Sequence, residues 1–280
     1  MPSGIIVIDK PSDWTSMDVC AKLRGRFHEK RVGHAGTLDP MATGVLPVFL
    51  GRATRAVTFA SESEKEYQFG LKLGVVTNTQ DVTGEIVRQT PFTGTAEDLL
   101  AVLPTFRGDI QQVPPMYSAI KINGQKLYDL ARKGREVERA PRPVTIHALE
   151  LEDQLGPDEF LLRVRCSKGT YVRTLCHDIG AAVGCGGCMS SLRRTMAAGF
   201  TLADSVTLDA VLQADDPAAL LLPVDAYFSG YPDLVADPEQ EKRIRNGAAL
   251  PMPGPYTDLV TGKTYTGPTI TVDAPNNQGQ

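Results

Sequence analysis

Tyr67-Gln-Phe-Gly-Leu-Lys-Leu73 alternates apolar residues with polar or small ones along its whole length. This period of two predicts a β-strand that buries one face. Residues 79–84 are rich in turn formers, and with the apolar pair in residues 85–88 they predict a hairpin with a longer loop. Residues 160–166 and the apolar run 4–8 predict further strands. Strands therefore form much of the predicted core.

Helical signals fill the intervals between these strands. Ser16 is a predicted N-cap for a helix that ends near Phe27, and Thr95 caps a second helix. Residues 171–180 have helical spacing, and Thr207 is a further predicted cap. Strands and helices do not alternate regularly as βαβ units. The pattern favours an α+β fold around a mixed, largely antiparallel sheet with flanking helices.

Composition limits the class of protein. The chain has 280 residues, 42% apolar and 22% charged, which is typical of a globular protein with a sizeable core. No cationic segment followed by an apolar run begins the chain, and no run is long enough to span a bilayer. We expect a cytoplasmic protein. The composition becomes rich in Pro and Gly from about Pro223, which predicts a domain boundary there.

Five cysteines are spread along the chain, an odd number that does not suggest a disulfide framework. The spacing of Cys185-Gly-Gly-Cys188 suits either a zinc hook or redox pair, or a tight glycine turn with two reduced thiols. No second pair and no histidine cluster completes a four-ligand zinc site. We therefore favour the turn and predict no metal.

Charge is distributed unevenly, although the net charge is only −4. Residues 121–142 hold seven Lys and Arg against three acids, residues 161–200 hold six against one, and residues 201–280 carry −7. The seven in the first segment are Lys121, Lys126, Arg132, Lys133, Arg135, Arg139 and Arg142. Two basic segments on an acidic protein indicate a localised polyanion-binding face, and the alternative is scattered solvated charges.

A glycine-rich segment contains the clearest candidate for chemistry. Gly33-His-Ala-Gly-Thr-Leu-Asp-Pro-Met-Ala-Thr-Gly44 places Asp39 among residues that allow unusual backbone angles. Pro40 biases Asp39 toward an extended conformation. The segment either presents Asp39 to a ligand or forms a turn in which Asp39 caps its own backbone.

Eight motifs occur together in one order. They are Asp9-Lys-Pro11, the 33–44 segment, Lys65-Glu-Tyr-Gln-Phe69, Phe106-Arg-Gly-Asp-Ile110, Pro115-Met-Tyr-Ser-Ala-Ile-Lys121, Lys126-Leu-Tyr128, Cys166-Ser-Lys-Gly-Thr-Tyr-Val-Arg173 and Leu192-Arg-Arg194. In these motifs the chain resembles bacterial TruB-type tRNA pseudouridine synthases over about residues 4–200, with a weaker match at 243–247. The resemblance implies the pseudouridine synthase fold and isomerisation of uridine 55 in the tRNA T-loop, without cofactor or metal.

The resemblance also implies roles for individual residues. Asp39, Arg173 and Tyr67 match the catalytic residues, with Arg173 facing the carboxylate and Tyr67 stacking on a flipped base. The residues implied to bind substrate are His34, Tyr67, Tyr171, Leu192 and Lys10. Other readings stay open at three positions: Arg173 as a phosphate ligand, Tyr67 as a core residue, and Lys10 as a structural residue.

The basic segment 121–142 matches an insertion that closes over the RNA stem-loop, with its Lys and Arg on phosphates. We predict a catalytic domain at 1–225 that includes this insertion. Residues 226–280 are predicted to form a short, reduced or degenerate PUA-like β module, with strands between 242–245 and 268–272. The expected partner is the tRNA T-stem-loop, with no membrane association and a monomeric state. The alternatives are a synthase acting on other T-loop-like RNAs, or a non-catalytic RNA-binding or tRNA-folding module.

Overall fold

The structure is a computed structural model of the chain, and it describes residues 2–122, 124–230, 237–246, 256–257 and 264–265. The chain divides after Val224 into two units. Within the described ranges every helix is too short or too polar to cross a lipid bilayer.

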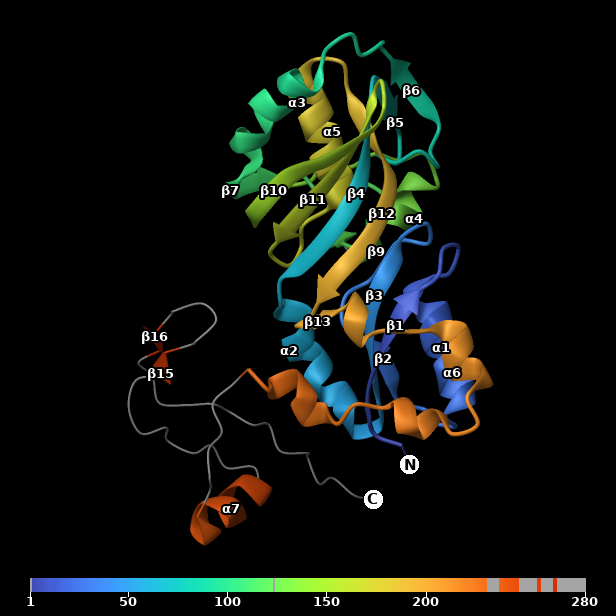
Figure 1. Ribbon diagram of the computed structural model, residues 1–280, viewed down its shortest axis with the longest axis vertical. Helices are drawn as coiled ribbons and strands as arrows, with labels where there is room; N and C mark the ends of the chain where they lie inside the picture. The colour runs from blue at the N-terminus through green and yellow to red at the C-terminus, as the bar shows by residue number, and fades with distance from the viewer. Residues whose placement is uncertain (1, 123, 231–236, 247–255, 258–263, 266–280) are drawn as a thin grey trace. The chain divides into compact units, whose positions relative to one another are not determined.

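The first unit is built around one large β-sheet. Its strands are β1 (Gly4–Lys10), β2 (Val32–His34), β3 (Thr43–Leu50), β4 (Lys65–Leu73), β7 (Gly108–Gln112), β10 (Arg142–Gly156), β11 (Glu159–Cys166), β12 (Gly187–Ala197), β13 (Phe200–Thr201) and β14 (Val206–Thr207). They run in the order β14-β1-β3-β12-β4-β11-β10-β7, with β2 beside β3 and β13 beside β12 (Figure 1). Only the β1–β14 and β3–β12 pairings of this sheet are parallel. The predicted mixed, largely antiparallel sheet is confirmed.

In the part of the chain that the structure describes, three small strand pairs lie outside this sheet. They are β5 (Val75–Thr77) with β6 (Ile86–Gln89), β8 (Lys121–Ile122) with β9 (Gln125–Lys126), and β15 (Tyr256–Thr257) with β16 (Thr264–Tyr265). The first pair is the hairpin with a longer loop that the turn residues 79–84 predict, and its pairing is antiparallel.

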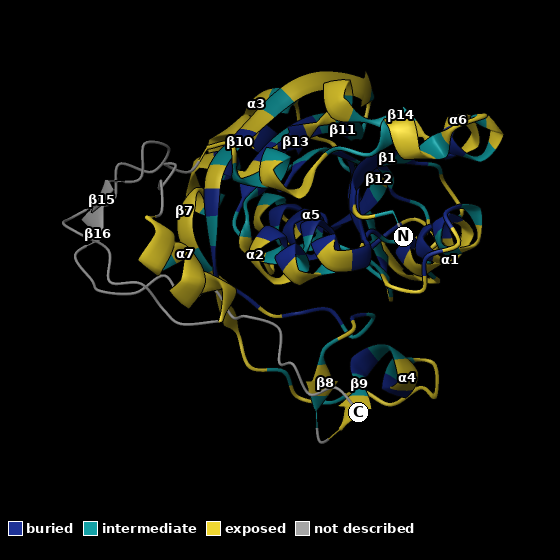
Figure 2. Cartoon of the chain, turned by 90° about the horizontal axis from the view of Figure 1, so that it is seen from below, coloured by how far each residue is buried: buried dark blue, intermediate teal, exposed yellow. Residues whose placement is uncertain are grey.

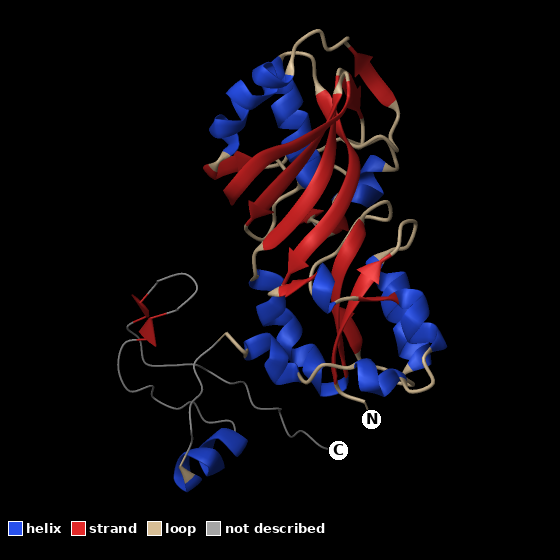
Figure 3. Cartoon of the chain, in the orientation of Figure 1, coloured by secondary structure: helices blue, strands red, loops and turns tan. Residues whose placement is uncertain are grey.

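Helices of the first unit flank the sheet (Figure 3). The α-helices are α1 (Ser16–Arg26), α2 (Val57–Glu62), α3 (Ala96–Val102), α4 (Leu127–Ala131), α5 (Val172–Val183), α6 (Leu208–Gln213) and α7 (Pro238–Arg245). The 3-10 helices are η1 (Gly51–Ala56), η2 (Leu103–Phe106), η3 (Leu202–Asp204), η4 (Pro217–Leu220) and η5 (Val224–Phe228). α5 packs against β12 and β4, α3 packs against α5, and α1 packs against β2.

β4 lies between β12 and β11 and confirms the alternation in its sequence. Tyr67, Phe69, Leu71 and Leu73 are all buried, whereas the intervening polar side chains are more exposed. Apolar side chains of β1, β3, β11, α1 and α5 complete the same core. Figure 2 shows α5 with buried residues facing this core.

Helix caps are mostly where the sequence predicts them. Thr95 caps α3 with a capping box to Asp98, and the Thr207 hydroxyl accepts from the backbone of α6. The prediction for α1 is wrong by one residue, because Thr15 is the N-cap. Ser16 is buried, and its hydroxyl instead hydrogen-bonds the backbone of Leu38.

The predicted strand at 242–245 is wrong, because these residues belong to α7. Asp237 forms a capping box with Gln240, and Pro238 occupies the first turn, which are strong helix-start signals. The predicted strand at 268–272 lies outside the described residues, as does most of the predicted PUA-like module.

Candidate active site

Asp39 lies in the loop between β2 and β3. Leu38 and Ala42 on either side are buried, and the Ala42 amide donates to the Asp39 carbonyl at 3.0 Å. Gly36 and Gly44 have φ values of +89° and +101°, which other residues rarely adopt. The carboxylate of Asp39 is 34% exposed on this anchored loop. The loop therefore fixes the backbone of Asp39 and leaves its side chain accessible.

Arg173, in the first turn of α5, binds the Asp39 carboxylate. Its Nε is 2.9 Å from Oδ2 of Asp39, and its Nη2 donates to Oδ1 at 3.3 Å. The guanidinium also donates to the carbonyls of Thr79 (3.1 Å) and Tyr117 (2.9 Å), and the side chain is only 8% exposed. Two parallel contacts to one carboxylate set its orientation.

Asp81 is a site residue that the sequence analysis missed. Its Oδ2 lies 3.8 Å from Nη1 of Arg173, so the guanidinium is placed between two carboxylates. Asp81 is buried, and its Oδ1 accepts from the Thr83 amide and from the hydroxyls of Thr79 and Thr83. The signal was the pair of threonines around one aspartate, which indicated only a turn.

Tyr67 and Tyr171 lie near this ion pair. Burial raises the pKa of both hydroxyls, and the charge of Asp39 acts in the same direction on each. Tyr67 projects from β4, and Tyr171 precedes α5, where its backbone exchanges two hydrogen bonds with the Gln112 side chain. Leu192 is buried on β12 opposite Phe69. The structure thus brings Asp39, Arg173, Tyr67 and Tyr171 together.

Lys10 does not have the position expected of a residue that contacts substrate. It is fully buried, and its Nζ donates to the carbonyls of Pro11, Trp14 and Pro40. Burial is the main cause that lowers its pKa to about 8. Lys10 ties the end of β1 to the Asp39 loop, which corresponds to the structural alternative.

His34 ends β2 at the start of the same loop. Burial lowers its pKa, and the nearby charge of Arg194 acts in the same direction. The imidazole is half-buried, and both effects favour its neutral form.

The basic segment divides into three parts. Lys121 lies in β8 and Lys126 in β9, whereas Arg132, Lys133 and Arg135 follow α4. Figure 2 shows β8, β9 and α4 beside the main sheet. Arg139 instead pairs with Glu136 and donates to the Pro114 carbonyl, and Arg142 begins β10.

An aromatic ring lies within this basic group, a feature that charge counting alone did not show. Nζ of Lys126 is 5.1 Å from the centre of the Tyr128 ring, and Cζ of Arg132 is 5.5 Å from it. The Lys126 ammonium also donates to the Tyr128 hydroxyl.

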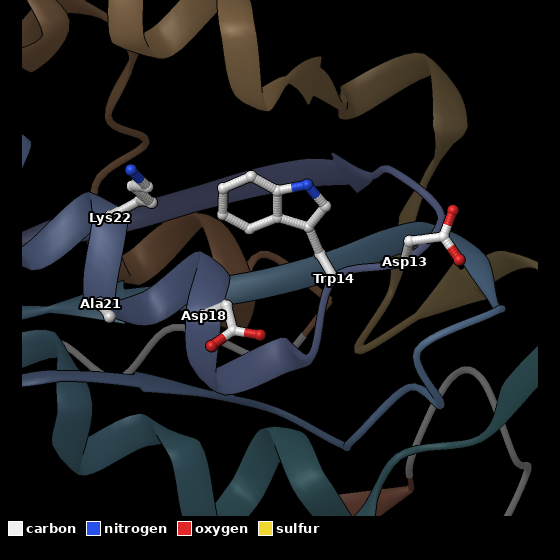
Figure 4. A pocket seen from close by; sticks show the side chains of 5 residues that line it. All are labelled: Asp13, Trp14, Asp18, Ala21 and Lys22. Atoms are coloured by element: carbon white, nitrogen blue, oxygen red, sulfur yellow. The ribbon is translucent and has the colours of Figure 1, made fainter.

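A separate cavity of about 420 Å³ lies at the start of α1. It is lined by Asp13, Trp14, Asp18, Ala21 and Lys22 (Figure 4). Among the described residues, no group of three or more His, Cys, Asp or Glu side chains has an arrangement that could hold a metal ion. All five cysteines are buried free thiols.

Comparison with known proteins identifies the family. The model of the TruB family pseudouridylate synthase N-terminal domain matches residues 24–172, and that of the tRNA pseudouridylate synthase B C-terminal domain matches residues 173–229. A tRNA pseudouridine synthase B from Clostridium kluyveri is 41% identical over 94% of this chain and 90% of its own length.

Solved structures agree with this match. An H/ACA RNP bound to a substrate RNA containing 2′-deoxyuridine is 26% identical with a TM-score of 0.68, covering 90% of this chain and 68% of that one. A Cbf5-Nop10-Gar1 complex is 29% identical with a TM-score of 0.64, and the match covers 80% of this chain and 61% of that one. The chain therefore belongs to the TruB family of pseudouridylate synthases.

Proposed function

We propose that this enzyme converts uridine 55 in the T-loop of tRNA to pseudouridine and that Asp39 is its nucleophile. The observation that carries the proposal is the Asp39 side chain, held by two contacts from Arg173 yet still 34% exposed. Relatives named tRNA pseudouridine synthase B support tRNA as the substrate.

The chemistry explains why these groups are needed together. The bond between N1 of uracil and C1′ of ribose must break, the base must turn, and C5 must bond to C1′. One proton leaves C5 and one is gained at N1, so the reaction is a redox-neutral isomerisation. A carboxylate that adds covalently divides this conversion into easier steps.

The target base must first leave its stack, because a base inside a folded loop is inaccessible to the carboxylate. We assign Tyr67 to stacking on the flipped base, with Tyr171 and Leu192 lining its pocket and His34 contacting the RNA loop. Residues 1–225 form the catalytic domain in this proposal, and 121–142 form the RNA clamp within it.

The test uses purified protein and an unmodified T-stem-loop RNA. Pseudouridine is then mapped by carbodiimide modification and primer extension. We expect product at position 55 only, and none in a matched RNA with cytidine there. Absence of product would favour the non-catalytic RNA-binding role, and faster conversion of other stem-loops would favour a different RNA target.

Neutralising Arg132, Lys133 and Arg135 together with Gln is expected to weaken binding more than chemistry. Each phosphate contact releases counterions, so affinity should fall about tenfold and the slope of log affinity against log salt should flatten by about 2. The measurement is filter binding across a salt series, with the single-turnover rate at saturating RNA measured in parallel.

The matched control removes three exposed positive charges elsewhere, at Lys30, Arg52 and Arg55. It should change the slope less. Full affinity with lost turnover in the Arg132, Lys133 and Arg135 variant would place this segment in the chemistry and contradict its role as a clamp.

A further inference from the structure

Arg194 carries a buried charge in the C-terminal half of β12. Its side chain is the largest with almost no exposure, at 1%. Nε donates to the Val45 carbonyl at 2.7 Å and Nη2 to the Gly36 carbonyl at 3.1 Å. The Tyr67 hydroxyl lies close to the guanidinium, whose charge opposes the rise in the Tyr67 pKa that burial causes. These partners are all uncharged oxygens, and no carboxylate of the described residues forms an ion pair with Arg194.

The carbonyls that bind the Arg194 side chain lie on either side of Asp39 in the chain. Gly36 precedes Asp39 in the loop and Val45 follows it, so one guanidinium holds both ends of the loop. The parallel pairing of β3 with β12 includes only Thr43 with Arg193 and Gly44 with Arg194. On its other side, Arg194 is in register with Tyr67 of β4. Arg194 therefore lies where the nucleophile loop and the stacking residue meet.

The backbone of Arg194 also explains why residue 44 is a glycine. A Cβ at Gly44 would lie 2.2 Å from the carbonyl oxygen of Arg194 and 2.8 Å from its amide nitrogen. Because glycine has no side chain, β3 and β12 can approach closely at this point and bring the end of the Asp39 loop against β12.

A contribution to stability alone does not account for a buried arginine at position 194. A buried charge carries a large desolvation penalty, and well-packed apolar side chains often replace buried ionic groups without loss of stability. The contacts of Arg194 instead determine where two other groups lie.

We propose that Arg194 is a positioning residue for the isomerisation: by binding carbonyls at both ends of the Asp39 loop and lying in register with Tyr67, it fixes the stacking ring and the carboxylate at one separation. This inference rests on the proposed function of Asp39 and Tyr67. Displacements of about 1 Å in such an arrangement can cost about 100-fold in rate.

The test compares Arg194→Met, Arg194→Lys and Tyr67→Phe, alone and with Met and Phe combined. Arg194→Met is expected to lower the single-turnover rate at saturating RNA about 100-fold, while the Kd for RNA changes by less than about threefold. Arg194→Lys keeps the charge and should recover part of the rate. In the Tyr67→Phe background the Arg194→Met effect should shrink to about tenfold, because the hydroxyl beside the guanidinium is already gone.

Arg107→Met is the matched control, because Arg107 also binds a carbonyl, that of Leu149, but lies between η2 and β7. It should leave the rate unchanged. Three outcomes would overturn the proposal. The first is an equal loss of rate in Arg194→Met and Arg107→Met, and the second is a double variant in which the two losses of rate simply multiply. The third is an affinity for RNA that falls as much as the rate.

A second measurement does not depend on activity. Arg194 contributes to the lowered pKa of His34, so Arg194→Met should raise the His34 pKa in an NMR titration, with Arg107→Met unchanged. An unchanged His34 pKa would show that the charge does not lie beside the loop and would overturn the proposal. If Arg194→Met does not fold, Arg194→Lys and its double variant with Tyr67→Phe carry the test. A wild-type enzyme inactive on T-loop RNA would contradict the proposed function, and the titration would still decide where Arg194 lies.

Discussion

Asp39→Asn is expected to lower the single-turnover rate of pseudouridine formation by at least about 10⁴-fold, the scale seen when a catalytic nucleophile is removed. The amide keeps the shape of the side chain but cannot form the covalent bond to the substrate. Arg173 keeps its contacts to Asp81, Thr79 and Tyr117, so the local structure should persist.

The measurements are the rate with saturating T-loop RNA, the Kd for that RNA and the thermal unfolding midpoint. Asp109→Asn is the control, because Asp109 is exposed on β7 and its side chain accepts from the Thr145 hydroxyl, far from Asp39 in the sequence. Asp39→Asn should match it in affinity and midpoint. Clear turnover by Asp39→Asn would remove Asp39 from the nucleophile role.

Arg173→Met is expected to give the second largest loss, about 10²- to 10³-fold in rate, the usual cost of removing one preorganised electrostatic partner. Asp39 would lose both contacts that orient it, and Asp81 would stay buried without its neighbouring cation. Leaving a buried charge unpaired is costly, so the thermal midpoint should fall as well.

Arg165→Met provides the comparison, because Arg165 pairs with Glu64 at 2.8 Å at an exposed site. Surface pairs contribute at most about 1 kcal/mol, so this variant should change neither rate nor midpoint appreciably. Arg173→Lys should recover less than half of the lost rate, since an ammonium lacks the planar pair of donors. Near-normal turnover by Arg173→Met would show that the Asp39 carboxylate acts without being oriented by Arg173.

The sequence predicts the elements whose signals are local. Alternation in β4 and β11 and threonine caps on α3 and α6 reflect contacts within a few residues, and the structure confirms them. β12 was not predicted as a strand, because Arg193 and Arg194 interrupt its apolar pattern. The buried Arg194 side chain donates to oxygens of β3 and of the loop before it, which no local window contains.

The candidate site likewise contains residues that local sequence reveals and residues that only the fold brings together. Asp39 is detectable from glycines and a proline in one short segment, whereas pairing it with Arg173 required the family resemblance. Asp81 has ordinary turn chemistry in sequence, and only the fold places it 3.8 Å from the Arg173 guanidinium. Lys10 shows the opposite case, because a charged residue in a motif is used entirely to hold backbone carbonyls.

The pairing of β3 with β12 has a consequence for biosynthesis. Val45 and its partner Arg194 are 149 residues apart in the chain, and Asp39 and Arg173 are 134 apart. Contacts of such long range form slowly and late compared with hairpins such as β10–β11. A nascent chain that has not yet exposed β12 beyond the ribosome therefore contains the Asp39 loop but no assembled centre. On the proposed function, we therefore expect RNA-modifying activity only from chains in which β12 has joined the sheet.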